Sequence, residues 1–402
     1  MQLLLSLFGI ACLIFIAWLL SEQRERINWR TILAALGLQT LFAAIALYIP
    51  AGERALVSVS NGVAHILSFA DEGIRFLFGD MPYNGFIFAF RVLPLVIFIS
   101  SLISLLYYLG VIQWLIKIIG GAIQKLLGTS KAESLAATGN IFLSQGETPL
   151  LIRPFLPHMT RSELFTIMTC GMASVAGSVI GGYAALGIEL KYLIAASFMA
   201  APGSILMAKM LVPETKVQIE QSDIDLDKSE HSNAIDALAS GAMSGTKVAV
   251  AIGTVLMAFI SVIAMTNAGL EYLGELVGWQ QLSMQSILGY VFAPIAFLIG
   301  VPSTDMQLAG SLIGQKLVLN EFVAYLNFTE IRSELTVQTQ VVMAFALCGF
   351  ANFCSIAIQI GSIGILAPER RGEIAGLGIK AVLAATLANL MSAALAGLFF
   401  NL

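Results

Sequence analysis

Two carboxylates within apolar segments are the residues of this sequence best placed to do chemistry. Glu321 lies in the run 314–325, which also carries Lys316 and Asn320, and Glu147 lies in a second short polar segment. A carboxylate inside a membrane costs at least ~2.5 kcal/mol, so it persists where it faces a cavity or a partner. We therefore expect Glu147 and Glu321 to face one site at the middle of a membrane.

Amide and hydroxyl side chains accompany these carboxylates, and Lys316 is the one cation near them in the sequence. An anionic substrate would call for Arg or Lys, so this mixture suits a neutral ligand rich in hydroxyl and amide groups. The expected polar set is Gln145, Glu147, Asn320, Glu321, Asn352 and Ser355. Sodium ions prefer oxygen ligands, so carbonyls of an unwound helix together with Asn140, Ser144 and Ser174 are candidates to hold Na⁺.

The composition places these segments in a lipid bilayer. Of the 402 residues, 58% are hydrophobic and 11% are charged, and the mean hydropathy is +0.87. Soluble domains carry about 25% charged residues, so the chain is predicted to be an integral membrane protein. The four cysteines show no metal-ligand spacing and the three histidines are scattered, so neither a metal centre nor a disulfide framework is expected. No basic surface that would bind nucleic acid is evident.

Apolar stretches of about the ~20 residues needed to cross a bilayer recur along the chain. The eight expected spans are 3–20, 32–49, 86–109, 164–187, 192–212, 248–265, 341–366 and 381–400. The first lacks a basic region and a cleavage site before or after it, so we interpret it as a transmembrane helix rather than a signal peptide. Most Lys and Arg residues then fall in cytoplasmic loops, which places both termini outside a bacterial cytoplasmic membrane.

The segments between the spans differ in kind. In residues 111–127, apolar side chains recur at helical spacing between polar ones. This pattern predicts an amphipathic helix in the inner interface. Residues 131–153 have basic flanks at both ends, which favours a re-entrant hairpin over a full span, and 314–325 is the polar middle of a second hairpin that enters from outside. Residues 51–80 and 282–301 are expected at the outer face. The acidic stretch 213–245 is expected to be a cytoplasmic loop.

An internal repeat relates the two hairpins. Glu147, 161–164 and 170–174 recur as Glu321, 332–335 and 348–352, at offsets of 174, 171 and 178 residues. The first copy starts inside and the second outside, so the repeats are inverted. Inverted repeats with broken helices that meet at the middle of the membrane are the architecture of secondary transporters.

Two other function classes fit less well. An intramembrane hydrolase would need a catalytic motif, and the sequence has neither His-Glu-x-x-His nor Gly-x-Ser-x-Gly. A passive channel would line a continuous helix with polar residues, whereas here they gather at two hairpin tips. We therefore expect a transporter and not an enzyme.

The longest motifs resemble the concentrative nucleoside transporter family. Residues 314–325 match its signature Gly-x-Lys-x-x-x-Asn-Glu-Phe-Val-Ala-aromatic, and 140–150 match its first hairpin. Residues 348–352 and 367–372 match its penultimate helix and the loop after it. The resemblance covers essentially the whole chain and is greatest to bacterial, sodium-coupled members with eight spans. It implies an all-α membrane fold with two re-entrant hairpins, interfacial helices, and a scaffold and a transport domain, assembled as a homotrimer.

The resemblance also implies site residues and a division of the chain. The base would contact Ser144, Gln145, Gly146, Glu147, Val179 and Val248. The ribose would contact Glu321, Asn352 and Ser355, with Phe350 close by. Na⁺ would bind Asn140, Leu143, Ser174 and Val175. The scaffold would comprise 1–110 and 248–268, and the transport repeats 111–212 and 269–402, with 213–247 as the loop between them.

Two departures bear on the substrate. Ser144 stands where many members of the family have Gly, and Gly146 stands where many have Thr or Ser. Ser at the first position accompanies a pyrimidine preference in the family, which implies uridine and cytidine as substrates. Some bacterial members couple to protons, so symport with H⁺ is the alternative to symport with Na⁺.

Overall fold

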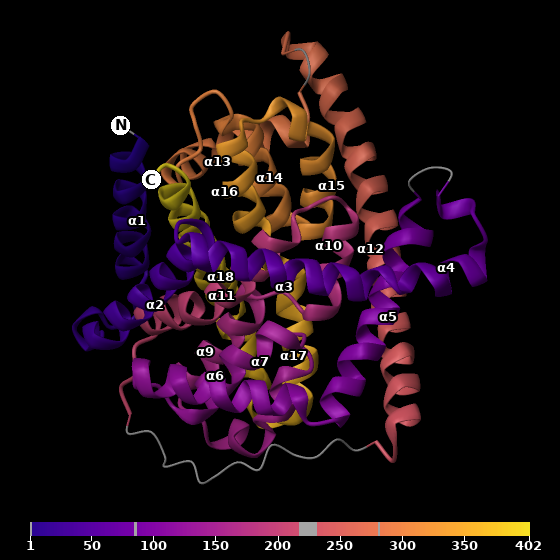
Figure 1. Ribbon diagram of the computed structural model, residues 1–402. Coiled ribbons are helices and arrows are strands. Elements are labelled where there is room, and N and C mark those ends of the chain that lie inside the picture. The colour runs from indigo at the N-terminus through magenta and orange to yellow at the C-terminus, as the bar shows by residue number, and fades with distance from the viewer. Residues whose placement is uncertain (1, 84–86, 217–230, 280–281) are drawn as a thin grey trace.

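The computed structural model describes residues 2–83, 87–216, 231–279 and 282–402, and within them every regular element is a helix (Figure 1). The first half contains α1 (Gln2–Leu19), α2 (Trp29–Leu47), α3 (Pro50–Ser68), α4 (Ala70–Phe78), α5 (Phe88–Tyr108), α6 (Val111–Leu127), α7 (Lys131–Phe142), α8 (Thr148–Leu151), α9 (Arg161–Ala173), α10 (Gly177–Ala185) and α11 (Leu190–Leu211). The second half contains α12 (Ala234–Val277), α13 (Met284–Leu298), α14 (Met306–Val318), α15 (Glu321–Ile331), α16 (Val337–Leu347), α17 (Phe353–Leu366) and α18 (Arg371–Phe400). Five short 3₁₀ turns join some of these helices.

Several helices are long and apolar enough to cross a bilayer. Among the described residues there are six such segments: Trp29–Leu47, Phe88–Tyr108, Arg161–Ala185, Leu190–Leu211, Ala234–Leu276 and Pro368–Phe400. Shorter apolar helices occur in α1, α13, α16 and α17. The chain is thus an all-helical, multi-span membrane protein. Eight spans result if α1 counts as one and the broken pair α16–α17 as another, and that number stays a prediction.

Burial separates a central group of helices from a peripheral pair. The most apolar window of α11 is 89% buried, whereas those of α5 and α12 are 22% and 17% buried. A peripheral helix with an apolar exterior is what lipid contact requires. Figure 1 shows α12 along one edge of the molecule beside α5, away from α9, α11 and α18.

Two pairs of helices fold back on themselves, and two long helices are interrupted. Helices α7 and α8 meet at the tip 143–147, and α14 and α15 meet at 319–320. The chain between α9 and α10 is unwound at 174–176, and between α16 and α17 at 348–352. Caps define these ends: Asn320 accepts from the Val323 amide and begins α15, and Asn352 accepts from the Ser355 amide and begins α17.

The second break depends on Gly349. Its φ of +157° is one that L side chains rarely adopt, and a Cβ there would lie 2.4 Å from Asn389 Oδ1 and 2.6 Å from the Ala173 carbonyl oxygen. The absent side chain therefore lets the two helix breaks approach each other.

The longest helix corrects the expected loop. Residues 213–245 were predicted as a cytoplasmic loop and 248–265 as a span, but α12 runs from Ala234 to Val277, which makes 44 residues. Asn233 caps its start by accepting from the amides of Ile235 and Asp236. The loop prediction is therefore wrong from Ala234 onward, because a cap and Ala-rich turns outweigh the polar character of this stretch. Residues 217–230 lie outside the described residues.

The amphipathic segment 111–127 forms α6. Ile112, Ile116 and Ile123 are buried on one face, and Trp114 and Ile118 are exposed on the other. This helix packs against α7 and so supports the first hairpin from one side. Segment 51–80 forms α3 and α4, and most of 282–301 forms α13.

Candidate functional site

Glu321 stands in the first turn of α15 and is 4% exposed. Its Oε1 accepts a hydrogen bond from the Tyr183 hydroxyl at 2.9 Å, and its Oε2 accepts one from Asn352 Nδ2 at 3.1 Å. The position at a helix N-terminus favours negative charge. Tyr183 is itself held between the rings of Phe322 and Tyr325, with centroids 4.7 and 4.8 Å away. The carboxylate is thus fixed in position by two different helices.

Asn352 is oriented by its second contact. Its Oδ1 accepts from the Ser355 amide at 3.0 Å, so its Nδ2 faces Glu321. The cap that starts α17 therefore also presents a donor to the second hairpin. Asn352 therefore caps α17 and also orients a hydrogen-bond donor toward Glu321.

The first hairpin reaches this group through Gln145. Gln145 Nε2 donates to Ser355 Oγ at 3.1 Å across 210 residues of sequence. Beside it, the amide and hydroxyl of Ser144 both donate to Glu147 Oε2 at 2.9 Å. A chain of hydrogen bonds therefore runs from the tip of the first hairpin through α17 to Glu321 in the second.

A cavity of about 360 Å³ adjoins the first hairpin, a volume within the range of small-molecule pockets. Its walls come from α5, the first hairpin, α10 and the start of α12. The lining residues include Ser104, Leu143, Glu147, Arg153, Ser178, His231 and Ser244. Arg153 and His231 belong to segments predicted to be cytoplasmic, so by that topology the cavity faces inward.

The structure brings most of the expected substrate residues together. Gln145, Glu321, Asn352 and Ser355 share one hydrogen-bonded chain, and Ser144, Gly146 and Glu147 form the tip next to it. Phe350 lies in the break between α16 and α17, and its amide donates to the Ser174 carbonyl. Val179 is buried on α10 beside Ser178, which lines the cavity. Val248 lies on α12, 37% exposed, and is not among the residues that line the cavity.

The expected sodium ligands lie at the end of α7 and in the break between α9 and α10. Asn140 is 1% exposed and its Nδ2 donates to the Ala136 carbonyl, but its Oδ1 has no hydrogen-bond partner. Ser174 and Val175 are in the break itself, and Leu143 follows the end of α7. A Cβ on Gly177 would lie 2.9 Å from the Phe142 carbonyl oxygen, so the break and the hairpin tip approach closely. A buried, unpartnered amide oxygen beside unwound backbone is a donor set that fits a hard monovalent cation.

Three polar residues in these contacts escaped the sequence analysis. Tyr183 supports Glu321, Gln359 donates to Gln145 Oε1, and Asn389 donates to the carbonyls of Ala173 and Cys348. Each is a single polar residue in an apolar helix. The spacing of Ser355 and Gln359, four apart on one helix face, is the signal that could have identified the second.

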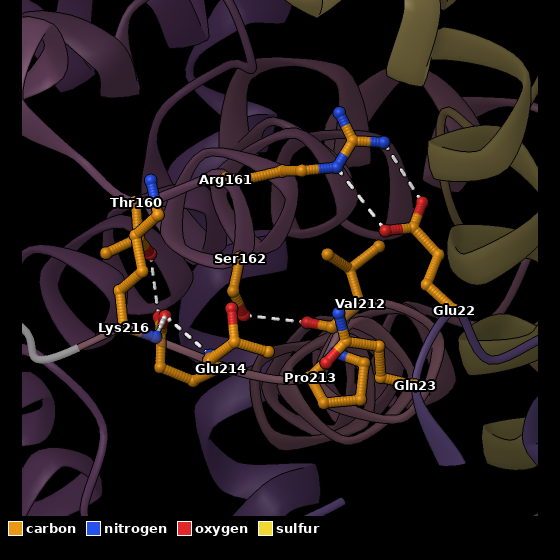
Figure 2. A pocket seen from close by; sticks show the side chains of 10 residues that line it. Glu22, Gln23, Thr160, Arg161, Ser162, Val212, Pro213, Glu214 and Lys216 are labelled. Carbon is orange, nitrogen blue, oxygen red and sulfur yellow. Dashed lines mark hydrogen bonds and ion pairs between the residues drawn. The ribbon is translucent and has the colours of Figure 1, made fainter. Parts of the chain in front are cut away.

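A smaller cavity, about 70 Å³, lies at the start of α9 and the end of α11 (Figure 2). Its polar groups are joined to one another: Arg161 donates to both oxygens of Glu22, and Thr160 donates to Glu214 (Figure 2). Burial raises the pKa of the Glu22 carboxyl, but hydrogen bonds from Arg161 and Lys380 outweigh it, so that its pKa lies below the ordinary value. These paired charges fasten the ends of α9 and α11 to the loop that follows α1.

The chain is similar to transporters throughout its length. Family models described as "Na+ dependent nucleoside transporter N-terminus", "Nucleoside recognition" and "Na+ dependent nucleoside transporter C-terminus" match residues 8–81, 89–189 and 192–397. "Nucleoside permease NupC" of Helicobacter pylori is 45% identical, with 99% of this chain and 98% of that protein covered. "Putative nucleoside permease NupX" of Escherichia coli is also 45% identical, with both chains fully covered.

Solved structures of the transporter CNTnw share the fold. At 48% identity, the inward-facing, substrate-bound structure has a TM-score of 0.96 and covers 100% of this chain and 98% of its own. A doubly substituted CNTnw in an outward-facing state has a TM-score of 0.97 and covers 100% and 99%. The overall likeness is therefore equal for the two states and does not distinguish between them.

Proposed function

The chain belongs to the Na⁺-dependent nucleoside transporter family, and from this premise we propose that it imports nucleosides by symport with Na⁺. The observation that carries the proposal is the buried Glu321, held by Tyr183 and Asn352 and linked through Ser355 to Gln145. A carboxylate with amide and hydroxyl neighbours accepts hydrogen bonds from vicinal hydroxyl groups. That chemistry suits the sugar of an uncharged nucleoside.

In the proposed binding mode, the two hairpins divide the substrate between them. Glu321, Asn352 and Ser355 bind the ribose, with Phe350 beside it. Ser144, Gln145, Gly146, Glu147 and Val179 bind the base. Among these substrate residues, Glu147 is the one that lines the cavity described above, and Val248 on α12 is proposed as a further contact of the base. The hydroxyl of Ser144 at the hairpin tip supports a preference for uridine and cytidine.

The co-transported ion is proposed to be Na⁺, bound by Asn140, Leu143, Ser174 and Val175. The unpartnered Asn140 Oδ1 supports this assignment over H⁺, because an amide oxygen is a ligand for a metal cation and does not titrate near neutral pH. Ser144, at the hairpin tip, is bonded to Glu147. An ion at this break would order the tip that presents Gln145 and so couple to the substrate.

Transport is proposed to follow an elevator-type alternation of access. Residues 111–212 and 269–402 would move against a scaffold from 1–110 and 248–268, in a homotrimer within the bacterial cytoplasmic membrane, with both termini outside. The cavity between the first hairpin and the α5–α12 pair supports an inward-facing arrangement. Substrate shifts such an equilibrium only as far as its affinity differs between the states.

The test is uptake of labelled uridine by proteoliposomes of the purified protein. We expect accumulation driven by an inward Na⁺ gradient, competition by cytidine, and weaker competition by adenosine. Accumulation driven by a pH gradient alone would assign H⁺ instead. Flux that no gradient concentrates would indicate a channel, and release of free base would indicate a hydrolase.

A further inference from the structure

We propose that Gln359 is a positioning residue that sets base selectivity by fixing which way the Gln145 carboxamide faces. The inference rests on the proposed function, because it concerns the nucleoside site described above. Gln359 lies on α17, one turn beyond Ser355, and its side chain is 1% exposed. It touches the first hairpin through Gln145 alone among the hydrogen bonds of the described residues.

The hydrogen bonds of this group all run in one direction. Gln359 Nε2 donates to Gln145 Oε1 at 3.0 Å, and Gln145 Nε2 donates to Ser355 Oγ at 3.1 Å. The Ser355 hydroxyl donates in turn to the Phe350 carbonyl oxygen. Two amides and one hydroxyl thus form a relay that ends on backbone.

The backbone end determines the orientation of every member. The Phe350 carbonyl oxygen and Asn352 Oδ1, which is 3.3 Å from Ser355 Oγ, can only accept. The Ser355 hydroxyl therefore donates its one proton on that side, and its oxygen is left to accept from Gln145. Gln145 must therefore turn its NH₂ toward Ser355 and its oxygen toward Gln359. If Gln359 turned over, two amide oxygens would face each other.

The Gln359 end of the relay carries an unsatisfied acceptor. Gln359 Oε1 is buried without a hydrogen-bond partner among the described residues. Buried acceptors are almost always satisfied, so an orphan one indicates that its orientation is imposed from elsewhere. Here the imposing group is the carbonyl of Phe350 at the helix break.

Gly171 makes room for the pair of glutamines. A Cβ added to Gly171 would lie 2.5 Å from Gln359 Nε2 and 3.0 Å from Gln145 Cβ. Gly171 belongs to segment 170–174 on α9, one of the segments that recurs in the second repeat. The glycine therefore offers a second, independent means of disturbing the same contact.

A carboxamide locked in one orientation distinguishes bases that an unlocked one would not. Uracil presents a donor at N3 and an acceptor at position 4, and cytosine presents an acceptor at N3 and a donor at position 4. A free amide can turn over to match either pattern, whereas one held by Gln359 matches a single pattern. Selectivity between uridine and cytidine thus depends on a residue that lies beyond the hairpin.

The experiment compares uptake of uridine and cytidine by wild type and Gln359→Met in proteoliposomes. The methionine has similar volume and no N–H donor. We expect wild type to discriminate, and the variant to bring the ratio of kcat/KM values closer to one by about three- to ten-fold, the range of one neutral hydrogen bond. The Na⁺ concentration for half-maximal uptake should stay within about two-fold of wild type, since the sodium ligands are untouched.

Gly171→Ala provides the second disturbance and should change the ratio in the same direction. Gln285→Met on α13 and Gly121→Ala on α6, where a Cβ meets nothing within 4 Å, are the matched controls and should keep the wild-type ratio. A wild type without discrimination, or an unchanged ratio in either transport-competent variant, overturns the role of Gln359. Wild type that takes up neither nucleoside contradicts the proposed function instead.

Discussion

Glu321 combines deep burial with negative charge, and both its oxygens are already engaged before any ligand is considered. A carboxylate has about four acceptor positions, so Tyr183 and Asn352 leave some of them for a substrate. Tyr183 and Asn352 then act as supports that keep the remaining positions correctly aimed. Charge, and not shape alone, is what this residue contributes.

The Glu321→Gln substitution tests that charge. The amide keeps the size of the side chain but loses a charge-assisted acceptor, worth about 1.5–3 kcal/mol, which corresponds to a fall in uridine kcat/KM of about ten-fold or more. Initial rates of uptake in proteoliposomes measure it. Glu330→Gln, on the same helix and not part of the site, is the control. Near-normal uptake by Glu321→Gln would refute the assigned role.

Asn140 is the residue whose substitution tests the proposed sodium site. Its Oδ1 is buried without a hydrogen-bond partner, and Asn140→Ala removes that oxygen. If the contact contributes as much as a charge-assisted hydrogen bond, about 1.5 kcal/mol or more, the Na⁺ concentration for half-maximal uptake should rise about ten-fold or more. The Na⁺ dependence of uridine uptake at fixed pH measures this rise.

Asn401→Ala, near the end of α18, is the matched control and should leave the sodium curve unchanged, since its side chain bonds only within its own helix. If Asn140→Ala keeps the wild-type curve as well, the ion binds elsewhere in the protein.

At the scale of the elements, Asn389 on α18 joins the two interrupted helices. Its Nδ2 donates to the Ala173 carbonyl at the end of α9 and to the Cys348 carbonyl at the break after α16. Its Oδ1 accepts from the buried ammonium of Lys316, which also donates to the Ala346 carbonyl. Carbonyls at helix ends lack partners within the helix, so one side chain satisfies both repeats at once.

We expect Asn389→Leu to destabilise the protein by more than about 3 kcal/mol, because it leaves two buried carbonyls without a partner and removes one of the two acceptors of the Lys316 ammonium. The melting temperature in detergent measures the effect. Lys316→Met should also destabilise, but adding it to Asn389→Leu should cost less than the sum of the two, since both substitutions remove the same Lys316–Asn389 hydrogen bond. Asn401→Leu on the same helix is the control. Additive effects would show that the two residues act independently.

Much of this arrangement is readable from the sequence, and the reasons are local. The hairpin tips and helix breaks carry polar or glycine residues within apolar runs, and the repeat of 170–174 at 348–352 relates one break to the other. The helix caps formed by Asn320 and Asn352 were found in the structure, whereas the sequence marked both residues only as polar. The long α12 was not anticipated, because its polar first turns resemble a loop when read without the Asn233 cap.

Hydrogen-bond partners that are far apart in the sequence could not be predicted in the same way. Tyr183 meets Glu321 over 138 residues, and Gln359 meets Gln145 over 214. A lone tyrosine or glutamine in an apolar helix gives no indication of what it faces, since its partner is chosen by tertiary packing. The contact of Val248 with the base stays a prediction, because it depends on how α12 lies relative to the bound substrate.

At the scale of the molecule, packing refines which helices are expected to move. Helices α1 and α2 contact α11 and α18, and Glu22 in the loop between α1 and α2 binds Arg161 and Lys380. Helix α5 packs along α12 and also against α10, and the cavity lies between the α5–α12 pair and the first hairpin. The division of the chain at residue 110 stays a prediction, and these contacts support the alternative in which α1 and α2 travel with the hairpins.

Cross-linking distinguishes these alternatives. Ser178→Cys with Ser244→Cys places thiols on opposite walls of the cavity, and a bismaleimide that joins them should abolish most uridine uptake by holding α10 to α12. Glu22→Cys with Lys380→Cys, joined by the same reagent, should leave uptake largely intact. Loss of uptake in the second pair would instead place α1 and α2 in the stationary part. The controls are the unsubstituted protein, whose Cys354 is exposed, and variants that carry one of the two added cysteines, each treated with the reagent.

The unequal burial of Glu321 and Glu147 determines which modified nucleosides the protein is expected to accept. Glu321 in the second hairpin is buried, so water cannot replace a missing sugar hydroxyl as its hydrogen-bond donor. A substrate without that hydroxyl is therefore strongly disfavoured. Glu147 is exposed and lines the cavity, where solvent can replace a hydrogen bond that a base does not make. Deoxy- and arabino-sugars should therefore be rejected more sharply than unusual bases, and base-modified drugs should enter more readily than sugar-modified ones.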